Sequence, residues 1–400
     1  MGSITDTSSL SAALDTVRQA AALGDERVTA HLASFARELS ADCEEPADYI
    51  HRIGYTALQQ PVLAAIGSSR GIFKHVVTGQ EKTTSLQSLV EASGLQEQLL
   101  TRLLRAMVTF GMLDSPSSGH YSANRRTHVL ARDYADAALQ HFLKNTGTGL
   151  LGIPRWIEAQ AKSLPSKPTP YMLHNNTDLT SMQSMDIAGL SAYMRYCTPD
   201  NGLSAVWSNA YPVQEAIASR TGSTRPFFID VAGGWGHQTS EMLLKFPDID
   251  GRCIVQEISS VVEQATSLAN GASKIEFKVQ DFFSPQPSSE HGAKIYYLRY
   301  IMHDWSDDED VQILSHLRDA MADDSVIIID EVLVPEQASG FDDPWPATVD
   351  IVMLAMFYNA RERTVKEFTH LAERVGGLKV QMAKQYDERR GNGIVVLAKA

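Results

Sequence analysis

The feature that most constrains the fold is a glycine-rich turn that follows an apolar run, Phe227-Phe228-Ile229-Asp230-Val231-Ala232-Gly233-Gly234-Trp235-Gly236. Glycines let the backbone turn without a Cβ clash. They also let a ligand approach main-chain N–H groups where a helix begins, here predicted over residues 238–246. A second apolar run at 253–255 leads to Glu257, about 20 residues after Gly236, where a carboxylate can bind ribose hydroxyls. The two segments together predict a nucleoside-binding α/β unit.

The glycine turn departs from the dinucleotide fingerprint G-x-G-x-x-G/A. Gly234 and Gly236 supply its first part, but Thr239 stands where the third small residue belongs. This departure argues against NAD or FAD as the ligand.

The second half of the chain alternates apolar runs with helical patterns, which predicts a mostly parallel, doubly wound sheet. The further apolar runs are 275–279, 294–299, 325–330, 378–383 and 393–399, and the helical patterns are 259–268, 308–321 and 364–375. Ligands of such sheets bind outside the carboxyl ends of the strands. The polar residues at those ends are Asp230, Glu257, Asp281, Arg299 with His303, and Glu331.

Composition limits the functions that the chain can have. The net charge of −13 argues against a protein that neutralises phosphate backbones. Cys43, Cys197 and Cys253 lie far apart and form no CxxC, so we expect neither a disulfide scaffold nor a cysteine zinc site. The polar start and the lack of 18 consecutive apolar residues predict a cytoplasmic protein without a membrane partner.

The first half has a helical texture. Residues 17–39 predict one helix, while 84–95 and 98–110 predict a helix-turn-helix that residues 117–122 extend with a hairpin, as in a winged helix. The second of these helices carries Arg102 and Arg105 among mostly apolar residues. It therefore favours a packing or dimerisation module over DNA binding. A further helical pattern at 187–197 lies close to Met182 and Met185, and methionines with helical spacing are more often core than pocket wall.

Five segments together resemble the motif series of S-adenosylmethionine-dependent O-methyltransferases of the caffeate and flavonoid type, in their fungal secondary-metabolite branch. These segments are residues 230–236, 280–283, 298–305, 330–335 and 359–364. The resemblance implies a class I methyltransferase sheet with an N-terminal winged-helix dimerisation domain. It also implies a homodimer that binds a small-molecule substrate and no nucleic acid.

The resemblance assigns cofactor-binding roles to residues that match the family motifs. For S-adenosyl-L-methionine these are Gly233, Gly234, Gly236, Glu257, Asp281, Phe282 and Arg299. Glu257 stands where the family usually has Asp, and Arg299 stands where it often has Lys. Ala232 replaces the first glycine of the motif, and its methyl group fits the turn if φ is negative there.

By the same resemblance His303 is the general base, since an imidazole titrates near neutral pH and takes the proton of a substrate hydroxyl. Glu331 and Glu362 would flank the imidazole and stabilise its charged form. Asp304 either caps the following helix, holds the turn or acts at the site. The implied substrate-binding residues are Met182, Met185, Tyr300, Met353 and Phe357. No metal ion is expected.

Three functions remain open from the sequence. The favoured one is O-methylation of a phenolic or enolic hydroxyl of a secondary metabolite. The second is a pericyclase on the same scaffold that uses the bound sulfonium as a fixed positive charge. The third is a winged-helix regulator that senses a metabolite. The predicted domains are a winged-helix dimerisation domain over 1–130, a helical connector that contributes to the substrate pocket over 131–220, and a Rossmann-like catalytic domain over 221–400.

Overall fold

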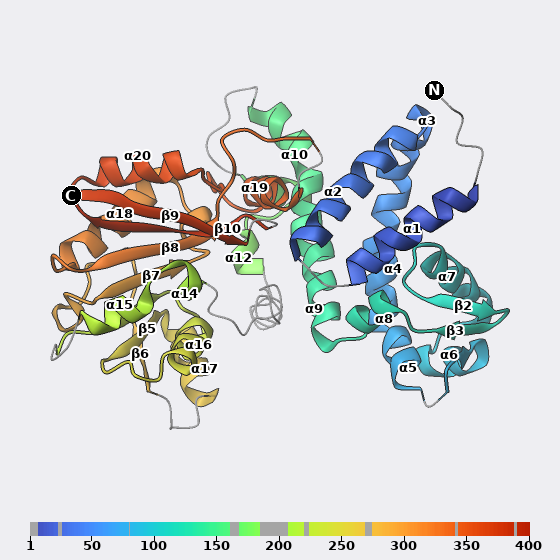
Figure 1. Cartoon of the computed structure of the whole chain (residues 1–400), viewed down its shortest axis with the longest axis horizontal. Helices are drawn as coiled ribbons and strands as arrows, with labels where there is room; N and C mark the ends of the chain where they lie inside the picture. The colour runs from blue at the N-terminus through green and yellow to red at the C-terminus, as the bar shows by residue number, and fades with distance from the viewer. Residues whose placement is uncertain are drawn as a thin grey trace.

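The structure is a computed structural model that describes residues 7–22, 26–79, 81–160, 168–184, 207–219, 224–268, 274–340, 343–387 and 390–400. A helical N-terminal half and a C-terminal α/β half lie at opposite ends of the molecule, with α10 and α19 between them (Figure 1). Within the described residues, we find no helix that has both the length and the apolar character needed to cross a membrane.

The α/β half is built on a seven-stranded sheet in the order β6-β5-β4-β7-β8-β10-β9. Its strands are β4 Phe228–Val231, β5 Cys253–Glu257, β6 Ile275–Val279, β7 Ile295–Arg299, β8 Val326–Val332, β9 Leu378–Asp387 and β10 Asn392–Lys399. The first five strands in this order pair in parallel, and β10 runs antiparallel to β8 and β9. The prediction of a mostly parallel sheet is confirmed, with each strand at the expected place in the chain.

Helices cover both faces of this sheet, because alternate residues of each strand point to opposite sides. The helices of this half are α14 Trp207–Ala210, α15 Val213–Ala218, α16 His237–Lys245, α17 Ser259–Leu268, α18 Asp307–Ala320, α19 Trp345–Met356 and α20 Val365–Val375. On one face, α18 and α20 pack on Ile229, Leu298 and Ile329. On the other, α14, α15 and α16 pack on Phe228 and Tyr297. This is the doubly wound arrangement that the alternation of strands and helices predicted.

The N-terminal half begins with α1 Thr7–Ala22, α2 Glu26–Cys43, α3 Pro46–His51, the π-helical turn η1 Arg52–Thr56, α4 Ala57–Ser69 and α5 Ile72–Thr78. A winged helix follows, made of β1 Thr84–Ser85, α6 Leu86–Ser93, α7 Glu97–Thr109, β2 Asp114–Ser117, β3 His120–Ser122 and α8 Arg125–Leu130. The single helix expected over 17–39 was wrong, since α1 and α2 share that segment. The helix expected over 187–197 lies outside the described residues.

The middle of the chain links the two halves through α9 Asp133–His141, the π-helical turn η2 Phe142–Thr146, α10 Gly147–Gln160, α11 Pro170–Asn175 and α12 Ser181–Ser184. Met172 of α11 packs with Met356 of α19 in a small apolar core. In addition, Ser181 donates a hydrogen bond to the Met356 carbonyl (2.9 Å). The connector is therefore joined directly to the segment that precedes the Glu-Arg-Thr motif.

Candidate functional site

The glycine turn joins β4 to α16 in a left-handed backbone path. Gly234 and Gly236 have φ of 58° and 73°. A Cβ on Gly233 would lie 2.4 Å from Cγ of Asp230, which excludes any larger residue there. Ala232 has a φ of 56°, so the negative φ that would accommodate its methyl group is not observed. An alanine in this region stores roughly 1–2 kcal/mol of backbone strain.

The side chain of Thr239, at the position that differs from the dinucleotide fingerprint, faces the sheet. Its Oγ1 donates to Oδ2 of Asp230 (2.7 Å), and both side chains are buried. Burial raises the pKa of Asp230 to about 7, against the opposing effect of the Thr239 hydrogen bond. Where the dinucleotide fingerprint has its third small residue, this chain has a threonine whose hydrogen bond joins α16 to β4.

Glu257 ends β5 beside the glycine turn. Its Oε1 accepts the Gly234 N–H (3.2 Å), and its Oε2 accepts the Ile258 N–H (2.8 Å). Burial raises the pKa of the Glu257 carboxyl, and these two hydrogen bonds oppose the rise. Gly234 leaves open space where a Cβ would stand. An open turn beside a carboxylate suits a ligand with a vicinal diol, such as a ribose.

Asp281 and Phe282 follow β6, and Arg299 ends β7. Oδ1 of the exposed Asp281 accepts the Phe283 N–H (2.9 Å), while Phe282 packs edge-on against Trp305 with ring centroids 5.8 Å apart. Arg299 is mostly buried, 3.4 Å from Oδ2 of Asp330. These residues and Glu257 thus belong to the carboxyl ends of β5, β6 and β7, which lie in the parallel part of one sheet.

His303 lies in the short 3₁₀ turn η5 Met302–Asp304, after the end of β7. Its Nδ1 is 2.7 Å from Oε1 of Glu362, a charge-assisted hydrogen bond by its length. A carboxylate can only accept, so Nδ1 carries the proton and Nε2 keeps a free lone pair when the ring is neutral. The ring also stacks on Tyr300, with centroids 5.7 Å apart.

Glu331 approaches the same imidazole from β8. Its Oε1 accepts the N–H groups of Ile301 and Met302, both at 2.9 Å. Its Oε2 lies 3.5 Å from Nδ1 of His303 and, like Oε2 of Glu362, is buried without a hydrogen-bond partner. The donor atoms of His303, Glu331 and Glu362 lie within 4.8 Å of one another, a spacing that could also hold a metal ion.

The charges of this group favour the imidazolium form. Burial works against it, but Glu331, Glu362 and Asp304 outweigh burial and raise the pKa of His303 well above its ordinary value. Burial raises the pKa of Glu331 to about 7, opposed by His303. Because His303 and Glu331 lie so close together, the protonation of each depends on the charge of the other.

Asp304 does not cap the following helix. Ser306 is the N-cap of α18, and its hydroxyl accepts the Glu309 N–H (3.4 Å). Oδ1 of Asp304 instead lies 3.7 Å from Nε2 of His303. Burial raises the pKa of Asp304 to about 6, opposed by His303. Of the roles left open by the sequence, helix capping is excluded.

A cavity of about 350 Å³ opens in front of His303 and Asp304. Met353 and Phe357 line it from α19 and its end, together with Tyr300 after β7 and Met182 of α12. Met185 lies outside the described residues. The glycine turn, Glu257, Asp281, Phe282 and Arg299 are not among the lining residues, and Glu331 and Glu362 lie behind the imidazole rather than in the wall. The apolar cavity, which His303 lines, is therefore distinct from the predicted cofactor-binding residues at the edge of the sheet.

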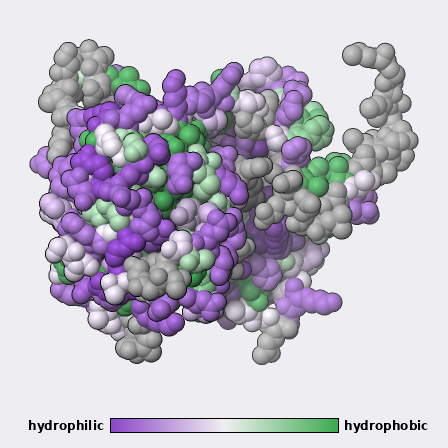
Figure 2. Space-filling model, turned by 60° about the vertical axis from the view of Figure 1, so that its left-hand side comes forward, coloured by the Kyte–Doolittle hydropathy of each residue, from purple (hydrophilic) through white to green (hydrophobic). Residues whose placement is uncertain are grey.

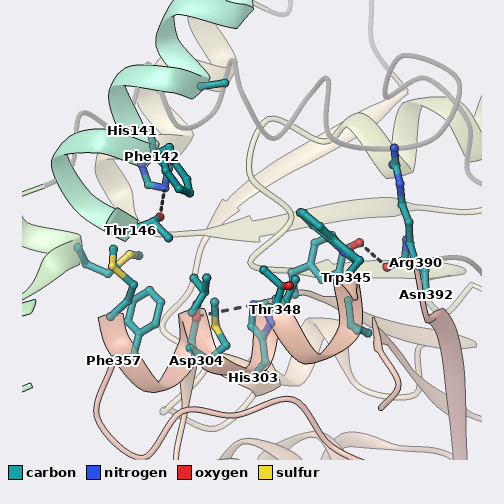
Figure 3. A pocket seen from close by; sticks show the side chains of 18 residues that line it. His141, Phe142, Thr146, His303, Asp304, Trp345, Thr348, Phe357, Arg390 and Asn392 are labelled. Atoms are coloured by element: carbon teal, nitrogen blue, oxygen red, sulfur yellow. Dashed lines mark hydrogen bonds and ion pairs between the residues drawn. The ribbon is translucent and has the colours of Figure 1, made fainter. Parts of the chain in front are cut away.

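Several lining residues carried no signal in the sequence. His141, Phe142 and Thr146 face the cavity from α9 and η2, while Trp345 and Thr348 face it from α19 (Figure 3). Burial lowers the pKa of His141, which favours a neutral ring. Arg390 and Asn392 form the far end, where Asn392 Oδ1 accepts the Tyr300 hydroxyl (2.8 Å). No motif marks these positions, because only the packing of α9 and η2 near α19 brings them together.

Comparisons with known proteins identify one family. Residues 202–377 match a family model described as the O-methyltransferase domain. The O-methyltransferase okaF of Penicillium ochrochloron is 30% identical over 350 residues, covering 84% of this chain and 86% of the relative. The chain belongs to the O-methyltransferase family.

Two further relatives extend the comparison over nearly the whole enzyme. The demethylsterigmatocystin 6-O-methyltransferase of Aspergillus parasiticus is 29% identical and covers 94% of each chain. The solved structure of LepI in complex with SAM superposes with a TM-score of 0.87 at 27% identity, covering 98% of this chain and 99% of that one. A structure described as a pericyclic reaction enzyme matches with the same TM-score, identity and coverage.

Proposed function

We propose that this enzyme transfers a methyl group from S-adenosylmethionine to a phenolic or enolic hydroxyl of a secondary metabolite, with His303 as general base. One observation carries the proposal. His303 lines the apolar cavity and binds Glu362 through Nδ1, so Nε2 is the ring nitrogen left to take the proton of an acceptor hydroxyl.

The residues at the sheet edge fit this cofactor. Gly233 and Gly236 allow the tight turn after β4, Gly234 leaves it open, and Glu257 offers a carboxylate to the ribose hydroxyls. Asp281 and Phe282 would hold the adenine, and Arg299 the methionine end. Solved relatives bind SAM or SAH, which supports the same site here. When bound, S-adenosylmethionine supplies an electrophilic methyl group on a cationic sulfur.

The side chains around His303 supply the proton chemistry. Nε2 would accept the proton of the acceptor hydroxyl, which makes the oxygen a stronger nucleophile. Glu362 and Glu331 stabilise the resulting imidazolium through Nδ1, because charge-assisted hydrogen bonds strengthen as the ring gains charge. The proton then leaves to solvent, and the site is reset.

The cavity supports a flat and largely apolar acceptor. Phe142, Trp345 and Phe357 contribute aromatic rings to the wall, and Met182 and Met353 contribute thioether side chains. Such walls bind a fused aromatic ring system through apolar contact, while a few polar groups orient it. A relative named for 6-O-methylation of demethylsterigmatocystin supports an acceptor of this kind.

A pericyclic reaction is the second candidate, because a similar structure is described as a pericyclic reaction enzyme. In that reaction the fixed positive charge of the site would polarise a substrate and no methyl group would be lost. The complete group of His303, Glu331 and Glu362 favours methyl transfer, since methylation of a hydroxyl needs a proton acceptor beside the cavity.

The test uses pure enzyme, methyl-labelled S-adenosylmethionine and a panel of hydroxylated polycyclic aromatics that includes demethylsterigmatocystin. We expect labelled product and S-adenosylhomocysteine in a ratio near one. A product isomeric with its substrate, formed without S-adenosylhomocysteine, would overturn methyl transfer and establish the second candidate.

The N-terminal half supports a homodimer. Phe35, Ile50, Tyr55 and Leu58 follow one another on α2, α3, η1 and α4 with exposed fractions of 57%, 65%, 68% and 58%. A monomer rarely exposes so much apolar surface in one region. The surface of the α/β half, by contrast, is mainly hydrophilic in the view of Figure 2. The domains proposed over 1–130, 131–220 and 221–400 would then serve dimerisation, pocket closure and catalysis.

A further inference from the structure

The arginine of the Glu-Arg-Thr motif is fully buried, with a charged side chain that the proposed chemistry leaves without a role. Arg363 is 1% exposed, directly after Glu362 and before Thr364. Thr364 caps α20, so its place in the motif is explained by the helix. A buried guanidinium is costly unless each of its donors finds an acceptor.

Arg363 finds its acceptors on both sides of the proposed base. Its Nη1 donates to the Met302 carbonyl (2.7 Å), and its Nη2 donates to the Trp305 carbonyl (3.0 Å). These two carbonyls flank His303 and Asp304 in the chain. The planar guanidinium therefore forms two hydrogen bonds to the turn that carries the imidazole, because its donors are held in a rigid fork.

Carboxylates of α18 hold the guanidinium in this position. Asp307 Oδ1 accepts from Nε (3.2 Å) and from Nη2 (2.8 Å), and Asp310 Oδ2 lies 2.8 Å from Nη2. The backbone of Arg363 is fixed as well, since its carbonyl accepts the Val334 N–H (3.2 Å) beyond β8. Arg363 thus joins α18, the end of β8 and the turn η5.

The turn η5 needs such external support. It is a single 3₁₀ turn, which has few hydrogen bonds of its own. Glu331 accepts two N–H groups at its start, Arg363 takes two carbonyls around it, and the Arg361 N–H donates to the His303 carbonyl (3.0 Å). Of these supports, Arg363 alone holds carbonyls on both sides of His303 and Asp304, and it directly follows Glu362 in the chain.

We propose that Arg363 is a positioning residue that keeps His303 within hydrogen-bond distance of Glu362 by holding the carbonyls of Met302 and Trp305. The role of this geometry in turnover rests on the proposed methyl transfer. The geometry itself does not depend on that function.

The experiment replaces Arg363 with lysine, which keeps the charge but cannot reach both carbonyls and Asp307 with one ammonium group. The matched control is Arg374→Lys. Arg374 also forms ion pairs with Asp307 and Asp308, but these contacts lie on α18, away from the base. Both purified proteins are compared with the wild type.

The first readout needs no acceptor. Diethyl pyrocarbonate modifies neutral imidazoles, so its pH dependence at the His303 peptide, measured by mass spectrometry, reports the pKa of that ring. Asp304, Glu331 and Glu362 are the charged groups that raise the pKa of His303. In Arg363→Lys we expect the hydrogen bond between His303 and Glu362 to weaken. The midpoint of His303 modification should then shift to lower pH. Arg374→Lys should leave the midpoint unchanged.

The second readout is steady-state methyl transfer. We expect kcat of Arg363→Lys to fall by about 10- to 100-fold, as a misplaced catalytic group does, with KM for S-adenosylmethionine changed by less than about twofold. An unchanged midpoint with unchanged kcat overturns the positioning role. A wild type without methyl transfer instead refutes the proposed function, and the modification midpoint still decides the role of Arg363.

If Arg363→Lys does not fold, as judged by circular dichroism, Asp307→Asn replaces it. This change removes the charge of one of the two carboxylates beside the guanidinium and leaves Arg363 in place. We expect a smaller shift of the His303 midpoint in the same direction. A folded Asp307→Asn variant with the midpoint of the wild type would overturn the proposal.

Discussion

Replacing Glu362 with glutamine tests the proton chemistry most directly, because it removes one charge and keeps the shape. The side-chain carbonyl of the introduced glutamine can still accept the Nδ1–H of His303, which Glu362 accepts at 2.7 Å. A hydrogen bond to a charged group contributes about 1.5–3 kcal/mol and a neutral one about 1 kcal/mol. The change therefore costs the imidazolium about 1–2 kcal/mol, which lowers the pKa of His303 by roughly one.

Two opposite effects on the rate follow. His303 acts as a base only when neutral, and its pKa is raised well above its ordinary value by the surrounding carboxylates. In wild type, kcat/KM should therefore rise with pH through a limb above the usual histidine range. In Glu362→Gln the limb should move down by about one pH unit, while the plateau falls about tenfold because the imidazolium formed in the transition state is less stabilised.

The assay measures kcat/KM for methyl transfer from about pH 5.5 to about pH 9.5. The variant should be slower than wild type at high pH and nearly equal to it at low pH. The control is Glu309→Gln, which alters a capping box that glutamine also satisfies and leaves His303 untouched. A lower plateau with an unmoved limb would refute the electrostatic role of Glu362, and so would an unchanged profile.

Four further outcomes can be checked. His303→Ala should slow methyl transfer by about 10²–10⁴ with unchanged cofactor affinity by calorimetry, and a rate within a few-fold of wild type would exclude it as the base. Glu257→Ala should weaken S-adenosylmethionine binding by about 1–3 kcal/mol, whereas tight NAD binding by wild type would contradict the site. Ala232→Gly should raise the free energy of unfolding by about 0.5–1 kcal/mol, because the relief of left-handed backbone strain exceeds the entropy cost of a glycine. A lower urea midpoint would show that the strain is absent. Phe35→Glu should convert the expected dimer to a monomer in light scattering, and a wild type that is already monomeric would refute the apolar interface.

Much of the fold could be predicted from local patterns in the sequence. The strands of the α/β half are short apolar runs that alternate with helical periods, and each occurs where the sequence predicts it. Such patterns are reliable because each strand and helix has to bury one face against the same sheet. In the N-terminal half the same reasoning merged α1 and α2, since the helical period continues across the point where the chain divides into two helices.

The motifs indicated His303, Glu331 and Glu362 as partners, and the structure brings their side chains together from three separate segments. The sequence left the role of Asp304 open, because its spacing before α18 suits a helix cap. Only the three-dimensional structure shows that Ser306 takes that position. Asp304 and Ser306 both have side chains that can cap a helix, and only the backbone conformation decides which of them does so.

By itself, the sequence determined the order of strands and helices, the glycine turn, and the residues at the carboxyl ends of the strands, because periodicity and glycine act over a few neighbouring residues. Tertiary structure alone decided the rest. It placed His141 in the wall of the cavity that His303 also lines, held Ala232 at positive φ, and buried Arg363 against the turn that carries the base. The cavity wall and the burial of Arg363 depend on contacts between segments far apart in the chain, whose energy depends on how closely whole helices and strands pack, and no local pattern records this.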